Sequence, residues 1–301
     1  MKNNKLAFLL VTLSAFFWGS NFNAGSIVVA SVTPLTAASE RFIIAAIAIF
    51  IFMLIKDKNN IIAFKSNWKP YTLLGLCGIT GFNLAFFMGL QTTSPINGAL
   101  IMATSPITTT LIASIVDKYR VLWSQVIGML ISLVGVIFVI SNGDINNIIK
   151  LHFNRGDLII LLGNLAWAIY TVGCRKFISN STPLQTTSFT MLIGTVGIVL
   201  FTIFQGNLVN AIINISLCHH LILIYMGIIG SVLAYLFWNV GIKNLGAAKT
   251  SVFFNLVPVF TLLLAFINGL IPTALQLIGA FMVIGGVIGA TGAYKTVMKK
   301  D

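Results

Sequence analysis

The sequence is poor in charged residues, and acidic residues are the scarcest. Only 8% of its 301 residues are charged, and 6 Asp and Glu stand against 18 Lys and Arg. Soluble domains carry about 25% charged residues, so a water-facing surface is excluded for most of the chain. The positive excess does not indicate a nucleic-acid partner, because the basic residues lie between apolar segments and form no continuous basic face.

Sequence motifs for catalysis and metal binding are also missing. There is no GxxxxGK[ST] loop for nucleotide hydrolysis, no HExxH and no GxSxG. Cys77, Cys174 and Cys218 stand alone, without CxxC or another metal-ligand spacing. The six acidic residues are scattered, mostly in predicted loops. We therefore expect no enzyme, no cofactor and no metal site.

Long apolar segments dominate what is present. Hydrophobic residues make up 57% of the chain, and the mean hydropathy is +0.99. A membrane-spanning helix needs about 20 mostly apolar residues. Ten such segments predict an all-α, multi-pass membrane protein in contact with the lipid bilayer: Leu6–Val28, Leu35–Ile55, Tyr71–Gln91, Pro95–Val116, Trp123–Ser141, Asp157–Cys174, Leu184–Phe204, Leu221–Ile242, Ala247–Ile267 and Ala274–Ala293.

The loop charges predict the orientation. With the N-terminus in the cytoplasm, nearly all loop Lys and Arg residues fall inside, and only Lys150 and Arg155 fall outside. This is the distribution that the positive-inside rule describes. We expect both termini to be cytoplasmic, the first helix to be retained, and the protein to lie in a bacterial inner membrane.

The two halves of the chain carry the same landmarks. Trp18 recurs as Trp167 and Pro34 as Pro183, each 149 residues later, and further pairs follow at 151 or 152 residues. Five spans per half is an odd number, so the second half enters the membrane from the opposite side, as in many secondary transporters. The prediction is two inverted five-helix repeats, residues 1–141 and 156–301, joined by an external linker at 142–155.

Glu40 and Arg41 are the strongly charged residues predicted to lie within a span. Such residues usually face a cavity or pair with a partner, because burying a charge in lipid is expensive. Adjacent helical residues point about 100° apart, so these two cannot face the same spot. In one interpretation Arg41 binds an anionic group of a solute and Glu40 exchanges a proton. In the other, both reach the membrane interface near the end of the second span.

Polar and aromatic residues near the middle of several spans form a second candidate site. A buried asparagine needs a hydrogen-bonding partner, and Tyr and Trp combine an apolar face with one polar group. Interhelical hydrogen bonding and interfacial aromatics are the alternative; His219 and His220 are expected at the interface. With Arg41, the predicted substrate-binding residues are Trp18, Asn21, Asn83, Trp167, Tyr170, Tyr235, Trp238 and Asn239.

Two prolines occupy equivalent positions in the fourth and ninth spans. Pro106 and Pro258 are 152 residues apart, and each lies near the middle of its span. Proline removes a helical hydrogen bond and bends the helix. Irregular backbone at membrane depth is tolerated where it lines a cavity or packs within protein. We expect paired bends beside a central chamber, with simple helix kinking as the alternative.

These segments resemble the drug/metabolite transporter superfamily, in its EamA-type ten-helix branch. Arg41 matches the arginine of the family's second span. Asp117 matches an acid that commonly follows the fourth span, but Gly269 stands where the second half would carry its counterpart. The segments that carry the resemblance are SAFFWGSNF (Ser14–Phe22), PLTAASERF (Pro34–Phe42), ATSPITTTLIASIV (Ala103–Val116), SQVIGMLISLVGV (Ser124–Val136), NLVPVFTLLLAFI (Asn255–Ile267) and LQLIGAFMVIGGV (Leu275–Val287).

The resemblance implies a solute carrier that works by alternating access. We expect a secondary transporter of small organic solutes, of amino acids or related metabolites, acting in export. A same-fold importer of a nucleoside-like or sulfonium compound is the first alternative, and a membrane enzyme or scaffold is the second. The sequence does not indicate an oligomeric state.

Overall fold

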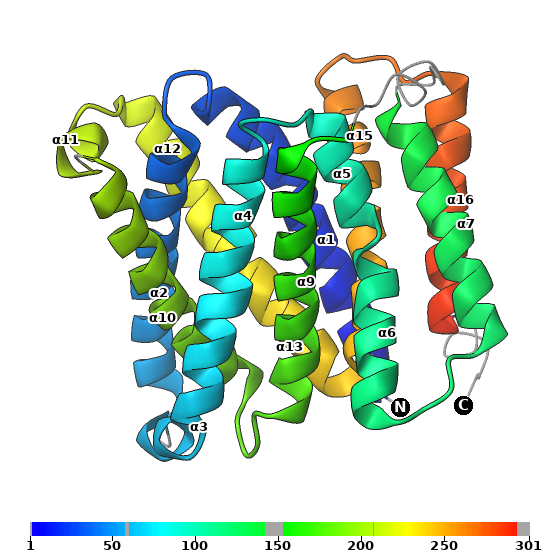
Figure 1. The fold of residues 1–301 in the computed structure, drawn as a ribbon, viewed down its shortest axis with the longest axis horizontal. Helices are drawn as coiled ribbons and strands as arrows, with labels where there is room; N and C mark the ends of the chain where they lie inside the picture. Colours follow the sequence, from blue (N-terminus) through cyan, green and yellow to red (C-terminus); the bar gives the residue numbers. More distant parts are fainter. Residues whose placement is uncertain (1, 58–59, 142–152, 207, 294–301) are drawn as a thin grey trace.

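The computed structural model describes residues 2–57, 60–141, 153–206 and 208–293, which form a bundle of helices (Figure 1). Ten helical segments among these residues are long and apolar enough to cross a membrane. Large apolar side chains such as Ile47, Leu111 and Phe281 are exposed on the outside of the bundle, where lipid would cover them. Together these features confirm the predicted all-α architecture with ten membrane spans.

The first repeat contains five of these spans. The third span joins α3, η1 and α4 end to end, and the fourth joins α5 and α6. The elements are α1 (Lys2–Val28), α2 (Pro34–Lys56), α3 (Asn60–Leu74), η1 (Gly75–Gly81), α4 (Phe82–Gly89), α5 (Pro95–Ala103), α6 (Ser105–Asp117) and α7 (Trp123–Ile140).

The second repeat has the same order of elements, with the short helix α11 and the 3-10 turn η3 added. The eighth span joins α12, η2 and α13, and the ninth joins α14, η3 and α15. The elements are α9 (Arg155–Lys176), α10 (Pro183–Gln205), α11 (Leu208–Ile213), α12 (Leu217–Tyr225), η2 (Met226–Leu233), α13 (Ala234–Leu245), α14 (Ala247–Val252), η3 (Phe253–Asn255), α15 (Leu256–Ile267) and α16 (Ala274–Thr291).

Side-chain caps begin many of these helices. Thr33 and Thr182, equivalent in the two repeats, each accept a hydrogen bond from the backbone N–H three residues on, and a proline follows each of them. Such caps satisfy N–H groups that have no partner within the helix, and proline suits the first helical position. The repeated Thr-Pro pair therefore sets the start of α2 and of α10.

The predicted start of the third span was wrong. We expected it at Tyr71, but the helix begins at Asn60 and is irregular at Asn67, shortly before Pro70. Lys65 and Lys69 lower the hydropathy of this first part, so the sequence predicted a loop there. Long lysine side chains can extend past apolar surface to the aqueous interface, which allows the helix to start earlier. The eighth span likewise begins at Leu217 and not at Leu221.

Equivalent glycines join the fifth and tenth spans. A Cβ atom added to Gly128 would lie 2.7 Å from the backbone oxygen of Gly286, and one added to Gly135 would lie 2.6 Å from that of Gly279. Small residues allow helix backbones to approach this closely in lipid. The pairing also requires α7 and α16 to run antiparallel, as inverted repeats do. The two helices lie together at one edge of the bundle (Figure 1).

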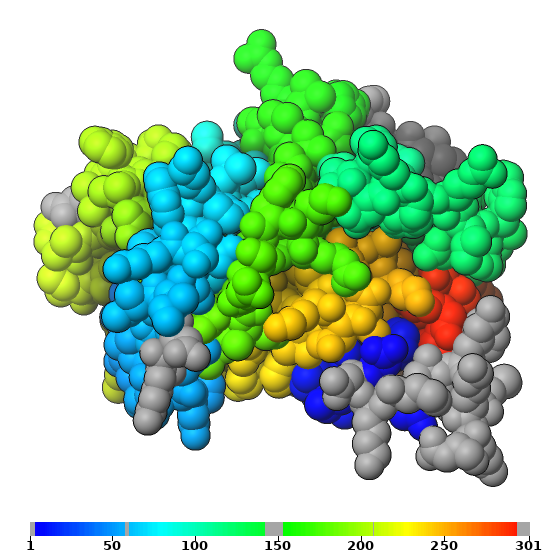
Figure 2. Space-filling view, turned by 90° about the horizontal axis from the view of Figure 1, so that it is seen from below, coloured from blue at the N-terminus to red at the C-terminus, as the bar shows by residue number. Residues whose placement is uncertain are grey.

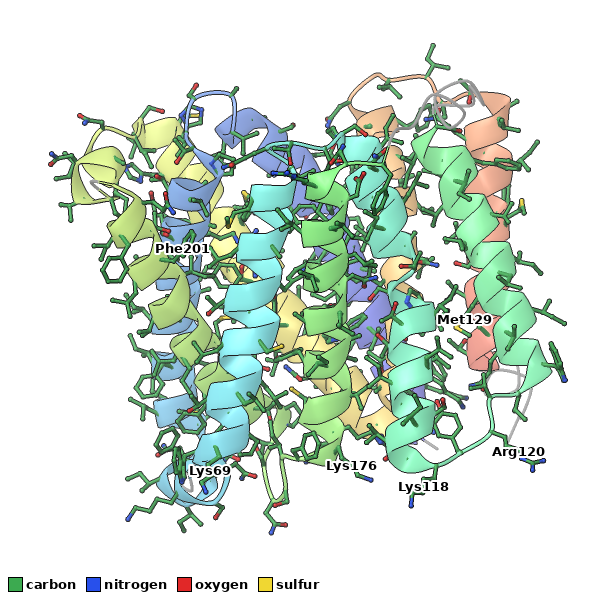
Figure 3. All side chains as sticks on the ribbon, in the orientation of Figure 1. Lys69, Lys118, Arg120, Met129, Lys176 and Phe201 are labelled. Carbon is green, nitrogen blue, oxygen red and sulfur yellow. The ribbon has the colours of Figure 1, made fainter. Side chains whose placement is uncertain are left out.

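The basic residues gather at one end of the bundle. Lys69, Lys118, Arg120 and Lys176 lie at the end where α1 begins and α16 finishes (Figure 3). We call this the basic end and the other the opposite end, where α9 begins with Arg155. This separation is the one that the loop charges predicted. The predicted linker, including Lys150, falls largely on residues 142–152, which lie outside the described residues.

Each repeat also contains a π-helical segment, which the sequence did not predict. The segments are η1 and η2, and they occupy equivalent positions in the third and eighth spans. π-helical turns inside longer helices often occur at functional sites. Both segments are rich in glycine, and their packing bears directly on the candidate site.

Candidate functional site

Five of the predicted binding residues form one aromatic cluster in the middle of the bundle. The ring centroid of Trp18 lies 5.6 Å from that of Trp167, 5.8 Å from Tyr235 and 5.1 Å from Trp238. Tyr170 stacks on Trp167 at 5.3 Å. The rings come from α1, α9 and α13, so both repeats contribute. We call these five residues the aromatic cluster.

The sequence analysis missed other rings that complete this cluster. Phe254 lies 5.6 Å from Trp18, Phe82 lies 5.3 Å from Trp167, and Phe42 lies 6.3 Å from Tyr235, measured between ring centroids. The chain contains 23 phenylalanines, so the identity of these three gave no signal. Two of them could have been found by their neighbours in the sequence. Phe42 follows Arg41, and Phe254 precedes Asn255.

Arg41 lies beside the aromatic cluster, about 10 Å along the helix axis from Pro34 at the start of α2. Its Nη2 donates to Oδ1 of Asn83 at 3.4 Å, and its guanidinium sits 4.6 Å from the ring centroid of Phe42. It is close enough to Tyr235 for an electrostatic interaction. Its buried Nε has no hydrogen-bond partner. Among the residues that the structure describes, no carboxylate pairs with this cation.

A chain of hydrogen bonds between side chains begins at Tyr170 of the aromatic cluster. Asn239 donates from Nδ2 to the Tyr170 hydroxyl at 2.9 Å and to Oγ1 of Thr187 at 3.0 Å. The Tyr170 hydroxyl lies 3.4 Å from Oγ1 of Thr190. Thr190 is the repeat equivalent of Arg41, so the same place in the second repeat is polar but uncharged. The buried Oδ1 of Asn239 has no hydrogen-bond partner.

The π-helical segments receive side chains from the opposite repeat. A Cβ atom added to Gly78 in η1 would collide with Cβ of Tyr170, and one added to Gly230 in η2 would collide with Nδ2 of Asn21. Asn21 and Tyr170 are repeat equivalents, as are the two glycines. Each repeat thus packs a first-helix side chain onto the other's π-helical glycine. Asn21 and Trp18 contact the same glycine, because Trp18 donates from Nε1 to the Gly230 carbonyl at 3.0 Å.

A polar cavity of about 560 Å³ lies toward the basic end and reaches Asn239. Its wall includes Arg175, Lys243 and Thr186. The two cations are held by backbone carbonyls: Arg175 donates to the carbonyl of Ile242 at 3.0 Å, and Lys243 to that of Ser181 at 3.0 Å. The cavity therefore connects the basic end with the chain of hydrogen bonds below the aromatic cluster.

The segment between α9 and α10 forms part of this cavity wall. It crosses the basic end between α3 and the α13–α14 region (Figure 2). Asn67 on α3 exchanges two hydrogen bonds with the Ser179 backbone, at 2.9 and 3.0 Å, and Tyr71 donates to Oγ of Ser181 at 2.8 Å. These bonds tie a loop of the second repeat to the first repeat.

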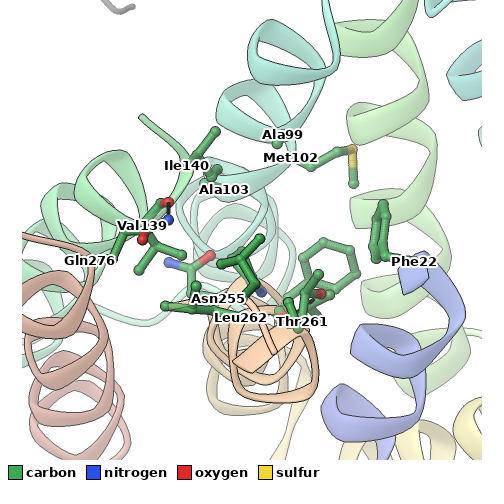
Figure 4. Close-up of a pocket in the computed structure, with 15 residues that line it drawn as sticks. Phe22, Ala99, Met102, Ala103, Val139, Ile140, Asn255, Thr261, Leu262 and Gln276 are labelled. Carbon is green, nitrogen blue, oxygen red and sulfur yellow. Dashed lines mark hydrogen bonds between the residues drawn. The ribbon is translucent and has the colours of Figure 1, made fainter. Parts of the chain in front are cut away.

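A second cavity, of about 280 Å³, lies among α1, α5, α7, α15 and α16 (Figure 4). Its lining is mainly apolar, with Phe22, Met102 and Leu262 among the larger side chains. Asn255 contributes its polar group but donates from Nδ2 to Oγ of Ser132 at 3.0 Å. This cavity contains none of the predicted binding residues.

Glu40 points away from Arg41 and contacts a residue that the sequence analysis placed at the interface. His220 on α12 brings its Nδ1 within 2.5 Å of Oε1 of Glu40. The Glu40 side chain is 10% exposed and that of His220 is 28% exposed. His219, in contrast, contacts Ser216 in its own first turn. No local pattern could reveal the Glu40–His220 contact, because 180 residues separate the two.

The fourth and ninth spans both break beside their prolines. α5 ends and α6 begins around Thr104, two residues before Pro106, and η3 separates α14 from α15 just before Pro258. Asn164 of α9 donates to the Ile101 carbonyl at 3.2 Å and to Oγ1 of Thr104 at 2.9 Å. A side chain of the second repeat thus binds the interrupted backbone of the first.

The described residues contain no group of three or more His, Cys, Asp or Glu side chains that could hold a metal ion. The arrangement places a buried cation, an aromatic cluster and a polar cavity next to one another within the bundle. Groups of these kinds can bind a small solute with an anionic group and an apolar or cationic part.

Comparison with known proteins agrees with this organisation. The chain is 40% identical over 295 residues to "Uncharacterized transporter YyaM" of Bacillus subtilis (strain 168), a match covering 98% of this chain and 96% of the relative. It is 21% identical over 292 residues to a "Probable terminal-alkyne amino-acid exporter" of Streptantibioticus cattleyicolor (strain ATCC 35852 / DSM 46488 / JCM 4925 / NBRC 14057 / NRRL 8057), covering 96% of this chain and 94% of the relative.

A solved crystal structure shares the fold. It superposes with a TM-score of 0.78 at 19% identity, over 97% of this chain and 99% of that chain. A family model matches the sequence twice, at residues 5–141 and 154–292, once for each repeat. The chain is a multi-pass membrane protein and belongs to the EamA-like transporter family.

Proposed function

We propose that this transporter carries small organic solutes with a carboxylate group, amino acids or related metabolites, and that it works in export by alternating access. Arg41 carries the argument. Its guanidinium lies within a membrane span, its Nε lacks a partner, and no described carboxylate neutralises it. An uncompensated buried cation is costly, and a bound carboxylate would supply two acceptors in the geometry that guanidinium prefers.

The surrounding residues suit the rest of such a solute. Asn83 sits against Arg41 and can hydrogen-bond the same carboxylate. The faces of Trp18, Trp167 and Tyr235 can accept an apolar side chain or an ammonium group through a cation–π contact. In this conformation the rings pack against one another, so a solute would have to part them. Asn239 and Tyr170 then offer polar groups on the way to the cavity at the basic end.

The proposed sidedness follows from charge. The basic end would face the cytoplasm of a bacterial inner membrane, with both termini there. A cytoplasmic carboxylate would then meet Arg175 and Lys243 at the cavity before it reached the aromatic cluster. Glu40 is the proposed coupling residue, since its carboxylate is nearly buried next to Arg41 in sequence. One relative is named as a probable amino-acid exporter, which supports this solute class.

Purified protein in proteoliposomes tests the proposal by counterflow of a panel of labelled amino acids, each compared with its carboxamide. We expect Arg41→Ala to raise KM for the carboxylate at least tenfold and to leave any weak transport of the carboxamide unchanged, because the variant removes the carboxylate's partner. Arg41→Lys should recover part of the affinity, since lysine keeps the charge but not the two-point contact. Equal effects on acid and amide would contradict the proposed role.

The aromatic cluster also favours a second solute class. Several electron-rich rings around one point are typical of sites for onium groups, so a sulfonium or nucleoside-like metabolite belongs in the same panel. Import of such a compound, with no counterflow of amino acids, would replace the proposed substrate and direction. Failure of every solute to move would revive a role other than transport for this particular chain.

A further inference from the structure

The contact between Glu40 and His220 joins the two repeats at the end opposite the basic end. Glu40 belongs to α2 of the first repeat and His220 to α12 of the second, with 2.5 Å between Oε1 and Nδ1. The other carboxylate oxygen of Glu40, Oε2, is buried and has no hydrogen-bond partner. The carboxylate and the imidazole are therefore close enough to share one proton.

Among the described residues, no other charged group is bonded to Glu40 or His220. The elements packed on α2 are α4, α10, α11, α12 and η2, and of these only α12 carries titratable residues. On α12, His219 bonds to Ser216, and the Tyr225 hydroxyl donates to Ser20. Cys218 is exposed. The neighbouring α1 has its lysines at its basic-end start.

Arg41 is the other charge on this part of α2. Its guanidinium points toward Asn83 and the ring of Phe42, whereas Glu40 points toward α12. The charge of the Glu40–His220 pair therefore depends on the proton that the two residues share and not on a third ionised side chain.

We propose that the Glu40–His220 pair is a proton-binding site that, when protonated, holds α2 against α12 and closes the opposite end above Arg41. With the proton bound, imidazolium donates to carboxylate, a bond about twice as strong as a neutral one. Imidazole changes charge between about pH 5 and pH 8. When the proton leaves to the aqueous phase, the carboxylate faces a neutral ring, and the contact loses the attraction between two opposite charges.

The apolar contacts beside the pair show what release would expose. Val28, Val32 and Ala37 pack against Leu223 and Met226 at the same end of the bundle. These contacts join α1 and α2 to α12 and the start of η2. Loss of the charged bond would let this apolar seal part, and Ala37, now 8% exposed, would meet water.

The inference rests on the proposed transport function, because closing one end matters only if a solute passes. The test measures how far the opposite end opens and uses no solute. Its result can therefore be read even if the protein transports no carboxylate. The probe is a membrane-impermeant maleimide on the purified, reconstituted protein. Ala37→Cys is placed in a background where the three native cysteines are alanine, and a second protein keeps Cys218 alone.

The labelling rate of the Ala37→Cys protein is divided by that of the protein with the exposed Cys218 at each pH, which removes the pH dependence of the thiol itself. We expect this ratio to rise roughly five- to tenfold between pH 6 and pH 8, the factor that corresponds to the difference between a charged and a neutral hydrogen bond. Glu40→Gln and His220→Gln should each abolish the rise. His219→Gln, a matched change one residue away, should keep it.

A ratio that does not change with pH overturns the proposal, and so does a rise that survives His220→Gln or disappears in His219→Gln. If either single variant fails to purify as a monodisperse protein, the exchanged pair Glu40→His with His220→Glu takes its place. The exchanged pair restores one acid and one imidazole across the same contact. It should show the rise again, and its absence in a folded exchanged protein counts against the proton site.

Discussion

Asp157 is a carboxylate held almost out of reach of water at the start of α9. It is 1% exposed, accepts hydrogen bonds from Nδ2 of Asn97 at 3.1 Å and from the backbone N–H of Asn154 at 2.8 Å, and also accepts from Oγ1 of Thr93. A negative charge is favourable at a helix N-terminus. These bonds fasten the turn between α4 and α5 to the second repeat.

Removing this carboxylate should destabilise the protein. Asp157→Ala removes the charged acceptor shared by Thr93, Asn97 and Asn154 at a buried position, and we expect a loss of about 3 kcal/mol in the free energy of unfolding. Asp117→Ala is the control, because Asp117 makes an exposed salt bridge of 3.0 Å to Lys176 and such pairs contribute about 0–1 kcal/mol. Thermal unfolding of both variants in detergent measures the difference. Equal melting temperatures would show that the Asp157 bonds add nothing.

Among single residues, chemical type predicted the candidate site better than local pattern did. Trp18, Trp167 and Tyr235 stood out because large polar aromatics are rare at midspan, and the structure brings them together. His220 did not stand out, because its partner is 180 residues away. Contacts across the two repeats depend on how helices pack, and a single sequence carries no direct signal for them.

At the level of elements, the contact between α7 and α16 depends on matched small residues. Gly286 faces the Gly128 carbonyl, and Gly285, its neighbour on the same helix, has no atom within 4 Å of an added Cβ. Without a hydrophobic driving force in lipid, close van der Waals packing is what joins such helices. The two adjacent glycines therefore separate the effect of packing from that of helix propensity.

Alanine at these two positions should change stability in opposite directions. Gly286→Ala places a methyl group 2.6 Å from the Gly128 oxygen and from the Ser132 nitrogen, and overpacking of this kind costs about 1–3 kcal/mol. Gly285→Ala points into open space and should be neutral or stabilising by up to about 1 kcal/mol, since alanine favours a helix over glycine. Chemical denaturation in mixed micelles compares the two. A Gly286→Ala protein as stable as Gly285→Ala would contradict close packing at this contact.

Helix irregularities were predictable only where proline marks them. Pro106 and Pro258 indicated breaks in the fourth and ninth spans, and the breaks lie just before each. The π-helical segments had no such mark. Gly78 and Gly230 carry no local sign of such a segment, yet each contacts a side chain from the opposite repeat, Tyr170 or Asn21. The widened turns follow from this tertiary contact and not from local propensity.

For the molecule as a whole, hydropathy and the repeat sufficed to predict ten spans and their inverted order. Length and composition fix which segments must lie in lipid, and an odd number of spans per repeat fixes the inversion. The cavity that reaches Asn239 could not be predicted this way. Which end of the path is open depends on packing among all ten spans, and the sequence is compatible with either end.

The orientation of the whole molecule in the membrane can be measured from its two ends. Arg120 lies at the basic end, and Asn214, exposed between α11 and α12, lies at the opposite end. In a cysteine-free background, Asn214→Cys should react with an impermeant maleimide added to intact cells, because that end faces outward under the positive-inside rule.

Arg120→Cys should react only after the cells are permeabilised. Asn214 and Arg120 are both exposed, so a difference between them reports sidedness and not burial. Labelling of Arg120→Cys but not Asn214→Cys in intact cells would reverse the molecule in the membrane. The cavity at the basic end would then admit solute from outside, and the same geometry would describe uptake.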